Sequence, residues 1–334
     1  MKIRKWLFVS ALCSFVGLGF YAYKSLKVYP LLQNGESPSF FVTEEGLTVA
    51  EVLEPFEERG QLKNATAVRL IIRLKGNPIA LKGHYQFKPG TTVLEAIRIL
   101  TNGYETPVWL RLSGYRSLEQ LAEQLSDQFG FPQAETLAML QEVGFEQILP
   151  NSYQVYQTSS LEDLKMRLIR EFDAFWSPIR RQQAEKHGLT PKEVVILSSI
   201  VQAETKEASE WGRVGALYLA RLKKPMRLQA DPTAVYAYQL VHPEAGVIRR
   251  VLDSITEFKH PYNTYQNDGL PPGPLATVEP EVIDAVLNAQ PGSEIFMCAD
   301  PNRPGFHVFA QSLSEHNRNA DRYHESLNRR EIRR

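Results

Sequence analysis

The chain has 334 residues, of which 43% are hydrophobic and 10% aromatic, enough apolar side chains for compact domains and too many for a disordered polypeptide. Its 38 Lys and Arg residues balance its 38 Asp and Glu residues, so no net positive charge favours nonspecific binding to nucleic acid. Cys13 and Cys298 are too few for a disulfide framework, and neither lies in a cluster typical of a zinc site. We therefore expect a globular fold that depends on hydrophobic cores, with no nucleic-acid partner.

Residues 6–23 predict a membrane anchor. The segment contains no charged side chain, and as a helix it would span about 27 Å at about 1.5 Å per residue, close to a bilayer core of about 30 Å. Basic residues are more frequent just before the segment than just after it, which favours a cytoplasmic N-terminus and an extracytoplasmic remainder. A cleaved signal peptide is the alternative, but the apolar run is long for one. We expect a single retained span in the cytoplasmic, or inner, membrane.

Three capping boxes predict helix starts in the first third of the chain. Each pairs a Ser or Thr with a Glu or Gln three residues later, and they begin at Thr48, Thr92 and Ser117. The extended apolar stretches 68–74 and 108–112 precede two of these starts and predict strands. The starts are unevenly spaced, so a repeat solenoid is not indicated. Small α+β modules fit this part of the chain better.

A polar, turn-forming stretch at 150–160 predicts a boundary between domains. An amphipathic helix follows over 161–176, and strands at 295–299 and 306–310 predict a hairpin nearer the C-terminus. The histidines in and after this hairpin lack the close spacing on one element that metal ligands need. We therefore expect no metal site.

The clearest helix start in the chain combines Thr190 as the N-cap, Pro191 at the first helical position and Glu193 at the third. The predicted helix continues to about Lys206. Its positions i, i+3, i+4 and i+7 on one face are Leu197, Ile200, Val201 and Glu204. Because the first three are apolar, we expect this face to point toward the core, and Glu204 shares it.

Glu204 is the main candidate for catalysis. An apolar environment disfavours the charged form of a carboxyl group and raises its pKa. Under that condition a glutamate holds a proton near neutral pH and can donate it to a leaving oxygen. The alternative, which the pattern alone favours, is a structural role in which Glu204 emerges at the helix end or pairs with an arginine such as Arg213 or Arg221.

Polar side chains suited to holding a polar polymer follow this helix. In the stretch 226–231 they alternate with apolar residues, as on a strand with one polar face, and Asp231 with Pro232 also fits the N-cap of a further helix. The irregular, proline-rich segment 261–274 adds tyrosines and amides. A sugar-lined cleft is one interpretation, and a rigid loop whose tyrosines cover the core is the other. The candidate binding residues are Arg227, Gln229, Asp231, Tyr262, Asn263 and Tyr265.

Several short motifs occur along the chain in an order known from one family. They are Ile-Val-Gln-Ala-Glu-Thr at 200–205, Met-Arg-Leu-Gln-Ala-Asp-Pro-Thr at 226–233, Tyr-Asn-Thr-Tyr at 262–265, Gly-Leu-Pro-Pro-Gly-Pro at 269–274, His-Val-Phe at 307–309 and Glu-His-Asn at 315–317. With them, the chain resembles the YceG-like group of endolytic murein transglycosylases, membrane-anchored lyases that cut the glycan strands of peptidoglycan. The resemblance covers nearly the whole chain, because residues 83–85 and 89–90 look like the family's LysM-like module.

The resemblance implies an α+β fold with an N-terminal transmembrane helix, a small LysM-like α+β module and a C-terminal α+β catalytic domain. The catalytic domain would lie outside the cytoplasmic membrane. The implied boundaries are 1–5 for the cytoplasmic N-terminus, 6–23 for the transmembrane helix, 36–106 for the LysM-like module, 107–150 for a small α+β connecting module and 151–334 for the YceG-like catalytic domain.

In the chemistry that the resemblance implies, Glu204 is the catalytic acid and acts alone. It would protonate the oxygen between N-acetylmuramic acid and N-acetylglucosamine, and then accept the proton of the muramyl C6 hydroxyl as this hydroxyl closes on C1. The product would be a 1,6-anhydro end, formed without water, metal or cofactor. The six binding candidates would line the glycan cleft.

The implied partners are peptidoglycan glycan strands, the membrane and peptidoglycan synthases, and the implied role is the termination of nascent strands. Two other functions are open. A membrane-tethered peptidoglycan-binding or scaffold protein would bind strands without cutting them. A hydrolytic muramidase would need a second carboxylate, about 5 to 9.5 Å from Glu204, with Glu207, Glu210, Asp231 and Asp268 as candidates.

Overall fold

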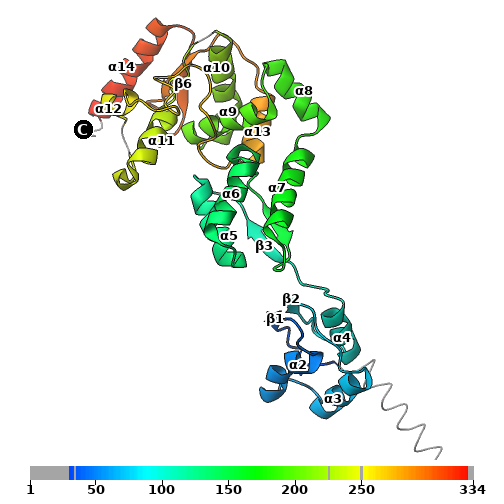
Figure 1. The fold of residues 1–334 in the computed structure, drawn as a ribbon. Helices are drawn as coiled ribbons and strands as arrows, with labels where there is room; N and C mark the ends of the chain where they lie inside the picture. The colour runs from blue at the N-terminus through cyan, green and yellow to red at the C-terminus, as the bar shows by residue number, and fades with distance from the viewer. Residues whose placement is uncertain (1–29, 34, 225, 249–250, 330–334) are drawn as a thin grey trace, which may run out of the picture. The chain divides into compact units, whose positions relative to one another are not determined.

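The structure is a computed structural model that describes residues 30–33, 35–224, 226–248 and 251–329. The anchor predicted at residues 6–23 lies outside these ranges, and within them no helix is long and apolar enough to cross a membrane. The described chain is mixed α+β, as expected. It divides into two compact units, whose elements are labelled in Figure 1.

The first unit contains the described residues up to Leu110 together with Gln154–Ser159. Its strands β1 and β2 pair antiparallel, and a single hydrophobic core that includes the fully buried Tyr85 and Phe87 joins the sheet to three helices. The elements are β1 (Ser39–Val42), α2 (Val49–Glu58), α3 (Ala65–Leu74), β2 (Gly83–Gln86) and α4 (Val93–Thr101).

Capping boxes start helices where the sequence predicts them. At Thr48 and Thr92, the threonine hydroxyl accepts a hydrogen bond from the backbone N–H three residues later, and the glutamate there accepts one from the threonine N–H. At Ser117 the box is half formed, because Ser117 Oγ accepts from Gln120 N while the Gln120 side chain accepts from Arg116 N. These contacts satisfy backbone groups that a helix start leaves unpaired.

The strand predicted at 68–74 is wrong, because these residues form most of α3. Val68, Ile71 and Ile72 bury one face of that helix. Their spacing of i, i+3 and i+4 outweighs the β-branched composition that indicated a strand. The strand predicted at 108–112 is confirmed as β3 (Val108–Arg111), which forms a two-stranded sheet with β4 (Ser152–Val155).

The second unit contains Arg111–Tyr153 and the described residues from Ser160 onward. The helix predicted at 161–176 and the predicted C-terminal hairpin are confirmed. The elements are α5 (Leu118–Phe129), α6 (Gln133–Val143), α7 (Leu161–Phe175), α8 (Pro178–His187), α9 (Pro191–Glu204), α10 (Trp211–Lys223), α11 (Asp231–Val241), α12 (Asp253–Thr256), α13 (Pro280–Leu287), β5 (Phe296–Ala299), β6 (His307–Ala310) and α14 (Leu313–Arg329).

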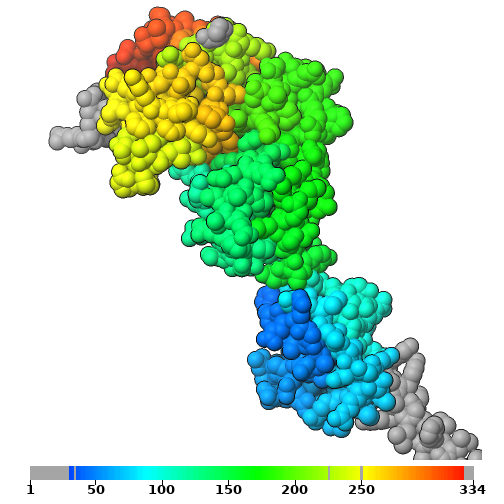
Figure 2. Space-filling model, in the orientation of Figure 1, coloured from blue at the N-terminus to red at the C-terminus, as the bar shows by residue number. Residues whose placement is uncertain are grey.

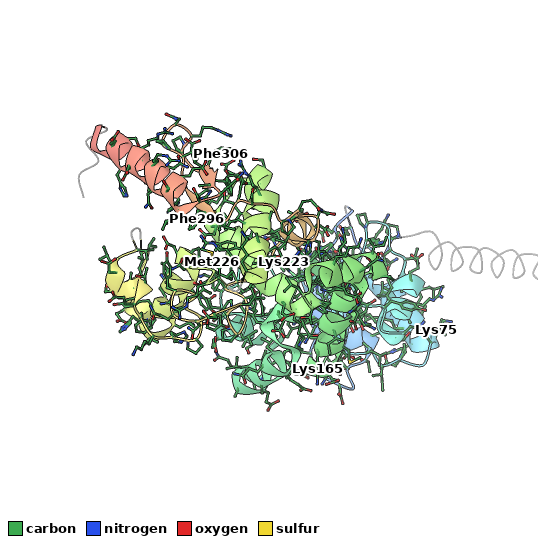
Figure 3. The ribbon with its side chains drawn as sticks, turned by 90° about the horizontal axis from the view of Figure 1, so that it is seen from above. Lys75, Lys165, Lys223, Met226, Phe296 and Phe306 are labelled. Carbon is green, nitrogen blue, oxygen red and sulfur yellow. The ribbon has the colours of Figure 1, made fainter. Side chains whose placement is uncertain are left out.

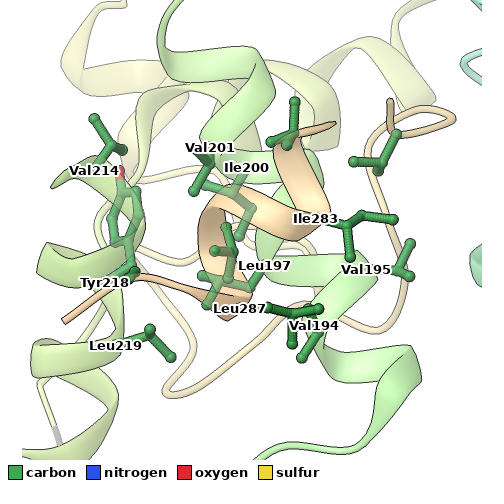
Figure 4. Packing of buried hydrophobic residues seen from close by; sticks show 14 of the residues in the cluster. Val194, Val195, Leu197, Ile200, Val201, Val214, Tyr218, Leu219, Ile283 and Leu287 are labelled. Atoms are coloured by element: carbon green, nitrogen blue, oxygen red, sulfur yellow. The ribbon is translucent and has the colours of Figure 1, made fainter. Parts of the chain in front are cut away.

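Helix α9 runs through the core of the second unit. It starts at the predicted Thr190 capping box and ends at Glu204 rather than near Lys206. Gly215 of α10 allows a close approach to α13, since a Cβ there would lie 3.2 Å from the Val286 side chain. The predicted apolar face of α9 is confirmed as buried. The side chains that meet there include Leu197, Ile200 and Val201 of α9, Val214 and Tyr218 of α10, and Ile283 and Leu287 of α13 (Figure 4).

Replacing Leu197 by Ala should lower the free energy of unfolding of the second unit by about 2–5 kcal/mol, the usual result of truncating a fully buried leucine. Urea denaturation followed by circular dichroism measures the change. Leu240→Ala is the matched control, because Leu240 lies in the same unit with 46% of its surface exposed, and it should change this free energy by about 0.5 kcal/mol or less. Equal losses in the two variants would contradict the packing of α9.

Candidate active site

Glu204, the last residue of α9, borders a cavity of about 480 Å³. The lining comes from α9, α10, the start of α11 and Tyr265 on the one hand, and from the β5–β6 hairpin and α14 on the other. In Figure 3, Phe296 and Phe306 mark the hairpin and Met226 marks the stretch before α11. The polar residues that border the cavity are Glu204, Tyr218, Arg221, Gln229, Asp231, Tyr265, His307 and His316.

A second cavity, of about 430 Å³, also borders Glu204 and Asp231. Arg116 contributes to it from the segment 111–153. Tyr236 Oη donates a hydrogen bond to the Arg116 carbonyl at 3.2 Å, and Figure 2 shows this segment and the rest of its unit as one continuous surface. Glu204 and Asp231 are therefore shared by two cavities, and the segment predicted as a connecting module supplies part of the second one.

The surroundings of Glu204 favour a protonated carboxyl group near neutral pH. Burial raises the pKa of Glu204 to about 7, against the opposing effect of a hydrogen bond from Tyr218 Oη to Glu204 Oε1 at 2.5 Å. The charge of Asp231 raises this pKa further, and the charge of Arg221 lowers it. The carboxyl group is enclosed by protein atoms, yet the residue keeps partial access to the cavity. Glu204 can thus hold a proton and still meet a ligand.

Of the two structural alternatives, Glu204 does lie at the end of its helix, but an ion pair with an arginine does not occur among the described residues. Arg213 donates from Nε and Nη2 to Glu294, at 2.9 and 2.6 Å. Arg221 donates instead to backbone carbonyl groups, with Ile295 O at 2.7 Å. Burial lowers the pKa of Arg221. Its charge acts on Glu204 at a distance, without an ion pair.

Asp231 holds a tyrosine rather than capping its helix. Tyr265 Oη donates to Asp231 Oδ1 at 2.6 Å, and burial, strengthened by this hydrogen bond, raises the pKa of Tyr265. The N-cap of α11 is Ala230, without a side-chain hydrogen bond, so the interpretation of Asp231 as the N-cap is wrong. Asp231 and Tyr265, two of the candidate binding residues, border the same cavity as Glu204.

Gln229 borders the same cavity from an unusual backbone conformation. Its φ is 46°, in the left-handed region that few residues other than glycine adopt. Residues 226–230 form no strand, but the expected alternation persists, with Leu228 and Ala230 buried. The Gln229 backbone N–H donates to Thr264 O at 3.2 Å. The loop that carries Tyr265 therefore fixes the strained backbone of Gln229.

The other three binding candidates border neither cavity. Asn263 is fully buried, and its amide donates to the carbonyl groups of residues 255, 256 and 258. The ring of Tyr262 lies 5.0 Å from that of Tyr236, centroid to centroid. Arg227 donates to Asp268 and to Tyr265 O. These side chains hold the 261–274 segment in place, so their contact with a ligand would be indirect.

Tyr218 and Arg116 border the cavities although no sequence signal marks them, whereas His316 belongs to the Glu-His-Asn motif at 315–317 but is not among the binding candidates. Tyr218 comes 14 residues after Glu204 and reaches it because α10 folds back along α9. His316 stacks on Phe296, with ring centroids 5.4 Å apart, and burial lowers its pKa. No described residue hydrogen-bonds its buried Nδ1 atom. Only the packing of distant elements makes these residues part of the site.

Comparisons with known proteins identify the family of this chain and two of its relatives. Residues 41–322 match the YceG-like family. The chain is 24% identical over 312 residues to the endolytic murein transglycosylase of Bacillus subtilis strain 168, covering 85% of this chain and 84% of that protein. It is 22% identical over 366 residues to the endolytic murein transglycosylase of Streptococcus pneumoniae strain D39, covering 98% of this chain but 66% of that protein.

A solved structure has a similar fold. The crystal structure of a yceG-like protein from Listeria monocytogenes superposes with a TM-score of 0.50 at 20% sequence identity. The superposition covers 85% of this chain and 99% of the Listeria chain. At this identity the similarity concerns the fold.

Two variants should move the pKa of Glu204 in opposite directions. Tyr218→Phe removes a donor to the carboxylate and should raise this pKa, whereas Asp231→Asn removes a neighbouring negative charge and should lower it. The δ-carbon of Glu204, followed by NMR during a pH titration of 13C-glutamate-labelled protein, reports both changes. Glu204→Gln identifies its signal. Shifts in the same direction would contradict the described contacts.

Glu204→Gln should stabilise the protein in alkaline solution more than in acid. The pKa of Glu204 is about 7 in the folded chain against an ordinary value of 4.5, so the favourable contribution of the protonated group is complete below pH about 4.5 and is lost as the pH rises through about 7. Glutamine cannot lose a proton and avoids that loss. Urea denaturation at pH 4 and pH 8 measures the difference, and an equal effect at both pH values would contradict it.

Proposed function

Because the chain belongs to the YceG-like family, we propose that it is an endolytic murein transglycosylase, a lyase that cleaves the glycan strands of peptidoglycan. The observation that carries the proposal is the carboxyl group of Glu204, with a pKa of about 7, at the border of two cavities. A general acid of this kind must be protonated at working pH and accessible to its substrate. The two relatives named endolytic murein transglycosylase support the choice of reaction.

In the proposed reaction, Glu204 donates its proton to the oxygen between C1 of N-acetylmuramic acid and N-acetylglucosamine. The C1–O bond breaks, the N-acetylglucosamine part leaves as an alcohol, and positive charge develops at C1. The Glu204 carboxylate then accepts the proton of the muramyl C6 hydroxyl while O6 bonds to C1. The product carries a 1,6-anhydro ring, no water is consumed, and Glu204 is protonated again.

Neighbouring groups suit both halves of this cycle. Tyr218 donates to Oε1 of Glu204, so Oε2 is the oxygen that remains for the substrate. The negative charge of Asp231, fixed by Tyr265, opposes loss of the Glu204 proton before the reaction and stabilises the positive charge that develops at C1. Gln229 borders the same cavity as a polar contact for the sugar.

The two cavities support an internal cut. Glu204 and Asp231 border both of them, so a strand lying through the site can extend beyond the broken bond on each side. An enzyme that cuts only near strand ends needs room for a long strand on one side of the bond and for a short piece on the other. Arg116, which borders the second cavity, gives that side a positive charge.

A hydrolytic muramidase is the second candidate, because Asp231 supplies a further carboxylate beside Glu204. The other three proposed carboxylates, Glu207, Glu210 and Asp268, border neither cavity. Glu210 is buried and bonded to His307, and Asp268 is exposed and paired with Arg227. A scaffold that only binds peptidoglycan gives no reason for a carboxyl group with so high a pKa at a cavity.

We also propose the wider setting that the sequence implies. Residues 6–23 would anchor the protein by one span in the cytoplasmic membrane, and residues 36–106 would form a LysM-like module outside it. Cleavage by residues 151–334, together with the segment that carries Arg116, would terminate nascent strands made by peptidoglycan synthases. The uncharged run at 6–23 and its flanking basic residues support the anchor.

The test is the mass of the products released from isolated sacculi. The wild-type protein should yield anhydro-muramyl ends, one water lighter than hydrolysed ends, and Glu204→Gln should lower the rate at least about 100-fold, because positioned acid-base transfer contributes about 10² to 10⁴. Glu185→Gln, at an exposed position of α8, is the matched control and should cut normally.

Each other result identifies a different function. Products with a free reducing end would indicate a muramidase. Binding to sacculi without shortening of the strands would indicate a scaffold. Undiminished anhydro products from Glu204→Gln would contradict the proposed role of Glu204.

A further inference from the structure

Glu210, a buried carboxylate that borders neither cavity, contacts both the backbone and the ring of His307. Glu210 Oε1 accepts a hydrogen bond from the backbone N–H of His307 at 3.0 Å, and Glu210 Oε2 lies 2.9 Å from His307 Nδ1. Thr205 Oγ1 lies 3.5 Å from the same oxygen. Only 7% of the surface of Glu210 is exposed. Such burial of a carboxylate is costly unless its hydrogen bonds are satisfied, and here they are.

This contact fixes the histidine at the edge of the cavity. His307 begins β6 and borders the same cavity as Glu204. Because Glu210 takes up Nδ1, that nitrogen carries a hydrogen, and the ring can turn only at the expense of the contact. No described residue hydrogen-bonds Nε2, and His307 borders the cavity. Nε2 is therefore the polar atom of His307 that remains for a ligand.

The cavity around His307 is suited to a sugar. Phe296 and His316, whose rings stack, border the hairpin side together with His307. A pyranose ring has apolar faces and a rim of hydroxyl groups, so it can lie against rings while its hydroxyls form hydrogen bonds. A sugar hydroxyl both donates and accepts and can pair with Nε2.

We propose that His307 binds the glycan through Nε2, by a hydrogen bond with a hydroxyl group of the sugar on the hairpin side of Glu204, and that Glu210 is a positioning residue acting through His307. This inference rests on the proposed function, because it takes the glycan as the ligand. The hairpin then contributes directly to substrate binding, and Glu210 contributes without touching the substrate. The competing explanation is a purely structural contact between the start of α10, which Glu210 directly precedes, and β6.

Two substitutions of His307 separate these explanations. The amide of asparagine falls near the position of Nδ1, so His307→Asn keeps a donor for Glu210 and removes Nε2. The amide of glutamine falls near Nε2, so His307→Gln keeps a polar atom near that position and weakens the contact with Glu210. A ligand contact predicts that His307→Asn loses glycan affinity, whereas a structural tie predicts that His307→Gln loses stability and His307→Asn loses nothing.

Binding is measured in Glu204→Gln protein, which leaves the glycan uncut. The probe is a peptide-free strand of alternating N-acetylglucosamine and N-acetylmuramic acid, titrated by calorimetry. His307→Asn should raise the Kd about tenfold, the usual scale for one lost hydrogen bond in a cleft, and His307→Gln should raise it less. His242→Asn is the matched control, because His242 also contacts a glutamate, Glu244, at 3.3 Å, but borders neither cavity.

A measurement without substitution of His307 completes the test. In 15N-histidine-labelled Glu204→Gln protein, the Nε2 signal of His307 should shift when the glycan binds. Adding Glu210→Gln should weaken glycan binding, although Glu210 itself does not contact the sugar. An unchanged Nε2 signal, or an unchanged Kd in a folded His307→Asn variant, would overturn the proposal. Failure of the proposed function is distinguishable, because the wild-type protein would then release no anhydro ends from sacculi. That result does not depend on the His307 variants.

Discussion

Burial of one carboxyl group at the end of a core helix governs this site. The apolar face of α9 that places Leu197, Ile200 and Val201 in the core continues to Glu204, so the helix that stabilises the second unit also carries the acid into a low-polarity environment. That environment raises the pKa of Glu204 to about 7 and makes it able to donate a proton near neutral pH. Fold stability and acidity therefore have a common origin.

The groups around Glu204 act in opposite directions on its proton. Tyr218 donates to the carboxylate and favours ionisation, whereas the fixed charge of Asp231 opposes it. A residue that first donates and later accepts a proton needs such a balance, because a pKa far from the working pH would make one of the two steps unfavourable. Tyr265 keeps Asp231 in place, and buried Asn263 holds the loop that carries Tyr265.

The second unit buries two carboxyl groups in different ways. Glu204 accepts one hydrogen bond, from Tyr218, and borders a cavity, and burial favours its protonated form. Glu210 instead contacts both the backbone N–H and the ring of His307. Thr205 follows Glu204 directly and contacts Glu210, which couples the end of α9 to the hairpin. The acid and the hairpin side of the cavity are thereby fixed relative to each other.

The sequence by itself determined the features that depend on neighbours along the chain. The capping boxes at Thr48, Thr92 and Thr190 and the place of Glu204 on an apolar helical face follow from spacings within one or two helical turns. The same local reasoning failed at 68–74, where β-branched residues in a helical pattern favoured the wrong element. Only the tertiary structure brought Tyr218 into contact with Glu204. It also brought His307 into contact with Glu210, which lies 97 residues away in the sequence. Hydrogen-bond partners and cavities arise from the packing of distant elements, which no local pattern encodes.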